Sequence, residues 1–394
     1  MNETVLLFLV VIVASFLFSL MMSQIPVLRV PSAISYLLFG ILLQKSPIQL
    51  PTEELHWLSH LGDVGLLFLM FLSGLEVDMR FFRTKHTGSV NPLVTASSIF
   101  LGTVLSSFVV AWIVTAIAPG NVHPYMLALL LSTTSLGVIV PVLEEKGILH
   151  GAYGQTILLS ALIADVSTML LVSLYVNLQV SGQLYDFLLA IAIVPGAMLL
   201  YGLIRTVQQT RIRKRVAGDA SARLRAVVAL VAAGCAFADY AGSEPILGSF
   251  LVGVVISAVP MAFAKEIRSY CHGLGYGLLV PMFFLSVGLN FHLTAFASPA
   301  VWQWTTLLVS AAFLVKLVPS IQLRKQFGTK AMLGAGLLLS TRLSLVIAAA
   351  NIAVAIGALP QYLGDAMMLT SIITCLLSPI LFMAVMSHSR PAMS

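Results

Sequence analysis

Apolar stretches long enough to cross a lipid bilayer fill most of this 394-residue chain, and short polar segments separate them. A helix needs about 20 apolar residues to span the hydrocarbon core of a membrane. Counting such stretches predicts thirteen membrane helices. Their approximate ranges are 4–22, 31–45, 61–76, 91–118, 124–145, 153–179, 183–208, 222–241, 244–263, 271–290, 300–322, 329–355 and 361–387. The expected fold class is an all-α polytopic membrane protein, with residues 1–394 forming a single integral membrane transporter domain.

The composition agrees with a membrane protein and excludes a soluble domain. The chain is 59% hydrophobic and 9% charged, whereas roughly a quarter of the residues in a soluble domain are charged. The three cysteines show no pairing pattern, so we expect no disulfide and no metal site. We likewise expect no cofactor. The formal net charge of +6 could suggest nucleic-acid or other acidic partners, but the placement of the cations argues otherwise.

The cations instead follow the topology of the predicted helices. Those after the odd-numbered spans are Arg29, Arg80, Arg83, Lys85, Lys146, Arg211, Arg213, Lys214, Arg215, Lys265, Arg268, Arg324, Lys325, Lys330 and Arg390. The opposite loops carry almost none, with Lys45 as the exception. The positive-inside rule therefore predicts a multi-pass protein of the cell (inner) membrane with its N-terminus outside and its C-terminus in the cytoplasm. We interpret the cations as topology signals and expect no nucleic-acid partner.

A weak internal repeat divides the chain into two similar halves. Residues 65–71 recur as 277–283, and residues 129–133 recur as 337–341. An odd number of predicted spans separates each pair, so the copies have opposite orientations in the membrane. Inverted repeats of this kind build secondary transporters with a site near the bilayer midplane. The predicted repeats are two five-helix units at about 31–179 and 244–387. The helices at about 4–22, 183–208 and 222–241 lie outside them, and the first and third are candidates for a scaffold or dimer surface.

Two of the predicted spans contain polar runs typical of broken helices. The span 124–145 contains Ser132-Thr133-Thr134-Ser135-Leu136-Gly137, and the span 329–355 contains Ser340-Thr341-Arg342-Leu343-Ser344. Hydroxyl groups can replace lost backbone hydrogen bonds, and an unwound backbone at this depth is tolerated where it lines a cavity. Ser and Thr also serve in helix packing. The match between the two runs across the repeat favours discontinuous helices.

Three charged residues lie inside predicted spans, where a charge costs at least ~2.5 kcal/mol. Asp165 can hold either a proton or a monovalent cation, and a site that alternates between the two is the least that exchange requires. The alternative role for Asp165 is a structural salt bridge. Lys316 is either the partner of Asp165, releasing a proton as a cation binds, or a snorkelling side chain. Arg342 does not titrate in the working range. Its expected role is to offset the carbonyl dipoles of a broken helix or to pair with an acid.

The remaining acids near the spans are weaker candidates. Asp63 and Asp239 lie near span ends, and Glu76, Asp78, Glu144 and Glu145 lie at the predicted cytoplasmic boundary. We interpret all of them as solvated caps or gate residues.

Three motifs in this order resemble a known family. They are Phe71-Leu72-Ser73-Gly74-Leu75-Glu76-Val77-Asp78 with its counterpart Phe283-Phe284-Leu285-Ser286-Val287-Gly288-Leu289, the run from Gly137 to Gly147, and the Ala-x-x-x-Asp that ends at Asp165. Together they resemble the monovalent cation:proton antiporters of the Kef/NapA/GerN type over nearly the whole chain. The resemblance implies a homodimer of thirteen-helix subunits with an NhaA-like fold, a dimer domain and a core domain. It also implies crossed broken helices and an elevator-like exchange of Na⁺ or K⁺ for protons.

The resemblance also implies roles for single residues. Asp165 matches the essential ion-binding Asp, Thr133 and Thr134 match the unwound segment that faces it, and Ser135 continues that segment. Lys316 falls where electrogenic relatives carry a Lys, and Arg342 where many Kef-like members carry an Arg.

Two departures leave the stoichiometry open. Ala164 stands where relatives usually have Asp, Asn or Gln, and Leu343-Ser344 follows Arg342 in place of Gly-Glu. A single titrating carboxylate favours electroneutral exchange of one proton for one cation. A titrating Lys316 would restore a second proton.

Other functions remain open from the residues alone. A sodium-coupled symporter for organic anions shares the inverted-repeat architecture but needs more polar ligands than the spans offer. A Kef-like ion efflux channel is a further alternative. An enzyme is not expected, because no Ser/His/Asp, His-Glu-x-x-His or Gly-x-Gly-Asp pattern lies in the spans.

Overall fold

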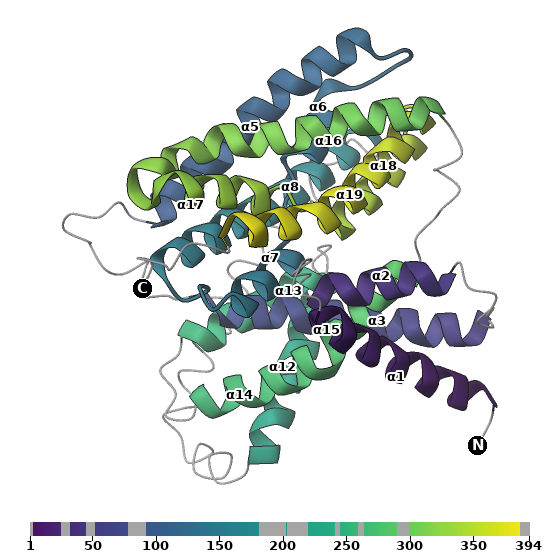
Figure 1. The fold of residues 1–394 in the computed structure, drawn as a ribbon, viewed down its shortest axis with the longest axis vertical. Coiled ribbons are helices and arrows are strands. Elements are labelled where there is room, and N and C mark those ends of the chain that lie inside the picture. The colour runs from purple at the N-terminus through teal and green to yellow at the C-terminus, as the bar shows by residue number, and fades with distance from the viewer. Residues whose placement is uncertain are drawn as a thin grey trace. The chain divides into compact units, whose positions relative to one another are not determined.

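The computed structural model describes residues 3–24, 32–44, 52–77, 92–180, 202, 220–240, 245–258, 264–289 and 299–386, and every regular element within these ranges is a helix (Figure 1). Eight helical spans in this part of the chain are long and apolar enough to cross a membrane, and four shorter apolar helices accompany them. The helices overlap each predicted span except 183–208, which lies outside the described residues apart from Gly202. The all-helical membrane fold is confirmed, and the number of thirteen helices stays a prediction.

The helices form two compact units, each built from both halves of the chain. Unit 1 takes residues 1–79 and 188–291, and unit 2 takes residues 80–187 and 292–394. The helices of unit 1 are α1 (Glu3–Ser23), α2 (Ser32–Gln44), α3 (Thr52–Leu75), α12 (Ala220–Tyr240), α13 (Pro245–Ala258), α14 (Ala264–Leu274), the π-helix η1 (Gly275–Leu279) and α15 (Val280–Leu289). Those of unit 2 are α5 (Pro92–Ile117), α6 (Pro124–Ser132), α7 (Leu136–Glu145), α8 (Ala152–Val180), α16 (Pro299–Ser320), the 3₁₀-helix η3 (Ile321–Leu323), α17 (Arg324–Leu339), α18 (Ser344–Ala355) and α19 (Gln361–Met386).

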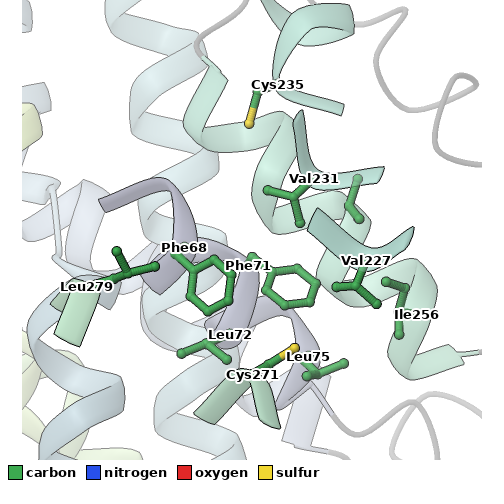
Figure 2. Packing of buried hydrophobic residues seen from close by; sticks show 11 residues of the cluster. Phe68, Phe71, Leu72, Leu75, Val227, Val231, Cys235, Ile256, Cys271 and Leu279 are labelled. Atoms are coloured by element: carbon green, nitrogen blue, oxygen red, sulfur yellow. The ribbon is translucent and has the colours of Figure 1, made fainter. Parts of the chain in front are cut away.

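Unit 1 is held together by close helix contacts and an apolar cluster. α3 packs against α13 and α2 against α15. The first contact requires glycine, because a Cβ atom on Gly253 would lie 2.1 Å from the carbonyl oxygen of Phe71. Figure 2 shows the cluster that α3 builds with α12, α13, α14 and η1. Its buried members are Phe68, Phe71, Leu72, Leu75, Val227, Val231, Cys235, Val252, Ile256, Cys271 and Leu279.

One acid of unit 1 departs from its predicted environment. Glu76, expected to be solvated, has a fully buried side chain at the end of α3. Its Oε1 atom lies 2.8 Å from His272 Nε2 and 3.5 Å from Arg268 Nε, both on α14. Arg268 also donates to the carbonyl oxygen of Leu75 at 2.8 Å. The expectation was wrong because α14 covers the end of α3 and supplies the partners that a buried carboxylate needs.

Unit 2 repeats one set of neighbours in its two segments. α5 packs against α6 and α8, and α7 against α8; α16 packs against α17 and α19, and α18 against α19. α5 also contacts α16. Both predicted interruptions are present: α6 ends at Ser132 and α7 begins at Leu136, while α17 ends at Leu339 and α18 begins at Ser344. The prediction of two discontinuous helices is therefore confirmed.

Candidate functional site

The two helix interruptions of unit 2 are hydrogen-bonded to each other. The backbone N–H of Ser135 donates to the carbonyl oxygen of Thr341 at 3.0 Å. The Thr134 hydroxyl donates to the carbonyl oxygen of Leu339 at 3.4 Å. Thr134 and Thr341 are buried. Two stretches of chain that are about 200 residues apart in sequence thus form one polar centre inside unit 2.

Hydroxyl groups at the ends of α6 and α17 donate to carbonyl oxygens in the last turn of each helix. On α6, Ser132 Oγ donates to Leu129 O at 2.8 Å and Thr133 Oγ1 donates to Leu130 O at 2.7 Å. On α17, Ser340 Oγ donates to Gly336 O and Thr341 Oγ1 donates to Leu338 O, each at 2.8 Å. Because the last four carbonyls of a helix lack the usual i+4 backbone donor, these hydroxyl groups help both helices to end among apolar surroundings.

Lys316 reaches the end of α6 from α16. The side chain is only 2% exposed. Its Nζ atom donates to the carbonyl oxygen of Ser132 at 2.7 Å and to Thr134 Oγ1 at 2.6 Å. A snorkelling lysine would extend its ammonium group toward water, so the snorkelling alternative is wrong for Lys316.

Arg342 approaches the same helix end from the interruption between α17 and α18. Its side chain is fully buried, and Nη2 donates to the carbonyl oxygen of Leu131. Nε and Nη1 have no hydrogen-bond partner among the residues that the structure describes. Lys316 and Arg342 therefore both place positive charge at the C-terminus of α6, where the helix dipole is negative. This agrees with the first of the two roles expected for Arg342, the compensation of carbonyl dipoles.

Asp165 lies on α8, which packs against α6, α7, α17 and α18. Its side chain is partly exposed. Its charge interacts with that of the Lys316 ammonium group. The neighbouring residue Ala164 is buried, and its carbonyl oxygen accepts a hydrogen bond from Thr168 Oγ1 at 2.6 Å. Asp165 is thus a carboxylate whose charge acts on the buried ammonium group of Lys316.

The structure brings together most of the residues predicted from the sequence. Lys316, Arg342 and Thr134 meet at the end of α6, whereas Thr133 bonds within its own helix and Ser135 contributes its backbone N–H. Sequence reasoning missed the carbonyl oxygens of Leu131 and Ser132, because a backbone acceptor has no signature in the sequence.

The geometry allows competition between an ammonium group and a metal cation. Ser132 O and Thr134 Oγ1 are oxygen atoms of the kind that hard cations such as Na⁺ and K⁺ prefer. In this structure both accept hydrogen bonds from Lys316. A cation that used these oxygens would have to displace the ammonium group, and the two like charges would disfavour each other.

Comparisons with known proteins find a matching family and similar relatives over most of the chain. The family described as "Sodium/hydrogen exchanger, transmembrane" matches residues 8–386. The chain is 31% identical to YjbQ of Bacillus subtilis (strain 168) over 383 residues, which cover 95% of this chain but only 62% of YjbQ. It is 24% identical to the Na(+)/H(+)-K(+) antiporter GerN of Bacillus cereus over 364 residues, covering 89% of this chain and 88% of GerN.

A solved structure has a similar fold. The sodium proton antiporter MjNhaP1 from Methanocaldococcus jannaschii at pH 8 superimposes with a TM-score of 0.68, covering 98% of this chain and 96% of that chain. The sequence identity is 15%, so this likeness concerns the fold alone.

Proposed function

Because the chain belongs to the family of transmembrane sodium/hydrogen exchangers, we propose that it exchanges a monovalent cation, Na⁺ or K⁺, for protons across the membrane by alternating access. The resemblance of its motifs to cation:proton antiporters is confirmed at the level of the family. GerN, whose name includes both Na⁺ and K⁺, supports either cation as substrate. The family is one of transporters, and we expect no enzymatic activity.

The polar centre of unit 2 carries the proposal. Asp165 is the group that alternately binds a proton and the cation, and the interruption Thr133–Ser135 supplies oxygen ligands. Lys316 and Arg342 are its charge partners. When the Asp165 carboxylate is ionised, it attracts the entering cation; the cation then takes oxygen atoms from Lys316. When Asp165 is protonated, Lys316 returns to Ser132 O and Thr134 Oγ1, the arrangement seen here.

The proposal also covers the repeat relation of the two halves, the crossing of the interrupted helices and the oligomeric state. The two halves are inverted repeats, and the interrupted helices α6–α7 and α17–α18 cross. The repeated set of neighbours within unit 2 and the hydrogen bond from Ser135 to Thr341 support this arrangement. The protein is a thirteen-helix homodimer in the cell membrane, with its N-terminus outside and its C-terminus in the cytoplasm.

The relatives do not favour the alternatives. A sodium-coupled organic-anion symporter and a Kef-like channel share parts of the architecture, but the matched family is that of exchangers. The polar centre of unit 2 also offers hydroxyl and carbonyl oxygens that can bind a small cation, among them Ser132 O and Thr134 Oγ1.

The test is a flux assay in proteoliposomes. Internal pH is followed while Na⁺, K⁺ or Li⁺ is added outside. An exchanger moves protons only when its cation is present, whereas a channel passes the cation without proton movement. Asp165→Asn should fold and yet lose the exchange, because an amide can neither ionise nor titrate. Cation-driven proton flux at the wild-type rate in Asp165→Asn would end the mechanism.

A further inference from the structure

One side of α16 is exposed along the second half of the helix. Leu314, Val318 and Ile321 are 53%, 48% and 55% exposed. Their spacing of four and three residues places them in one row, since such residues are neighbours on a helix surface. Lys316 lies on the opposite, buried side of the same helix. α16 is therefore a two-sided helix, with the polar centre on one side and an apolar row on the other.

Three cations follow this row where α16 passes into α17. Arg324, Lys325 and Lys330 are all exposed. None of the three forms an ion pair or a side-chain hydrogen bond with any residue that the structure describes. The sequence contains no Asp or Glu between Glu266 and Asp365. No acidic residue therefore lies near these three cations in the sequence.

The backbone that carries these cations is anchored on α8. Tyr153 donates its hydroxyl to the carbonyl oxygen of Ala331 at 2.7 Å. Its ring also packs edge-on against Phe327, with the ring centroids 5.3 Å apart. Between these contacts the chain turns at Gly328, which has a φ of 84° that favours glycine. The cations thus lie on the turn between α16 and α17, which Tyr153 holds against α8; we call this turn the corner of unit 2.

We propose that this corner binds one anionic phospholipid. Its acyl chains lie along Leu314, Val318 and Ile321, and its phosphate lies among Arg324, Lys325 and Lys330; we call these six residues the lipid strip. Each cation near a membrane surface favours anionic lipid roughly fivefold. The positive-inside rule accounts for cations on this side of the membrane, but not for an exposed apolar row that leads directly to three cations without an acidic partner among the described residues.

A lipid fits the strip better than a second copy of the chain. A two-fold contact through this surface brings the same patch of both copies together, so three cations of each copy would face three of the other. An anionic lipid supplies the missing negative charge and covers the apolar row at once. Because Lys316 lies on the other side of α16, the bound lipid also stabilises the helix that holds the ammonium group at the end of α6.

Hydrogen exchange in nanodiscs tests the assignment. The wild-type protein is placed in phosphatidylcholine alone and in phosphatidylcholine with phosphatidylglycerol. We expect amides of residues 318–332 to exchange several-fold more slowly with phosphatidylglycerol, while those of α5 stay unchanged. Equal exchange in both lipids would overturn the proposal. So would protection that rises with protein concentration in phosphatidylcholine alone, since a second copy would then be the occupant.

Two triple variants separate charge from folding. In R324Q/K325Q/K330Q the protection should disappear, and the preference for retained phosphatidylglycerol in native mass spectrometry should fall about a hundredfold, at roughly fivefold per cation. R324K/K325R/K330R keeps all three charges and should behave as wild type. If both variants bind the lipid as wild type does, the strip is not the site. Equal protection by soluble glycerol phosphate would refute the role of the apolar row.

Discussion

Replacement of Lys316 by Met tests whether the buried ammonium group holds the end of α6. The change removes two hydrogen bonds, of 2.7 Å to Ser132 O and 2.6 Å to Thr134 Oγ1. Hydrogen bonds from charged donors contribute about 1.5–3 kcal/mol each, and a buried carbonyl left without a donor adds to the loss. Relief of the desolvation of the ammonium group, and of its repulsion by Arg342, acts in the opposite direction. We expect a net destabilisation of about 3 kcal/mol.

The assay is thermal unfolding of the purified protein in detergent, with Lys146→Met as the matched control. Lys146 lies on the loop after α7, and its side chain forms no hydrogen bond or ion pair with the part of the chain that the structure describes, so its replacement should change stability by less than about 0.5 kcal/mol. Lys316→Gln should lose about half as much stability as Lys316→Met, because the amide can still donate to one of the two oxygens. Unfolding of Lys316→Met at the wild-type temperature would refute the role of Lys316 at the end of α6.

The same variants separate a structural role from a role in transport. Lys316→Gln removes a positive charge that competes with the substrate cation. At an effective dielectric constant of about 20, a like charge a few Å away disfavours cation binding by more than 1.4 kcal/mol, so the apparent cation affinity should rise at least tenfold. The affinity is read from the cation dependence of proton flux in proteoliposomes. An unchanged affinity together with lowered stability would leave Lys316 as a structural residue only.

Three further predictions address the polar centre, the charge balance and unit 1. Thr134→Val removes a hydroxyl that bonds both Lys316 and Leu339 O, so stability should fall by about 1–3 kcal/mol and cation affinity should weaken. Thr306→Val, whose hydroxyl bonds only its own helix, is the control, and equal behaviour of the two would contradict the assignment. With one titrating carboxylate, a potential of 100 mV, worth ~2.3 kcal/mol per charge, should leave the exchange rate unchanged; acceleration that disappears in Lys316→Gln would instead assign a second proton to that lysine. Gly253→Ala should destabilise unit 1 in thermal unfolding, because the new Cβ would lie 2.1 Å from Phe71 O, whereas Gly277→Ala meets nothing within 4 Å and should be neutral.

The sequence determined the membrane fold and the location of its unusual residues. Apolar length alone predicts helices, because a backbone in lipid must satisfy its own hydrogen bonds. The hydroxyl-rich runs at 132–135 and 340–344 predict the two interruptions for the same reason, and both are present. Asp165, Lys316 and Arg342 could be singled out because a charge inside the bilayer is costly.

Only the tertiary structure decided what these residues contact. Lys316 and Arg342 meet at Ser132 O and Leu131 O, and a carbonyl is identical at every position of a sequence, so no pattern could indicate those acceptors. Glu76 looked solvated because it follows the last apolar residues of its span, yet α14 covers it with Arg268 and His272 from a segment almost 200 residues away. The local pattern of apolar and polar residues predicts which segments lie in the membrane. The partners of a buried charge come from distant segments, and their approach is decided by helix packing.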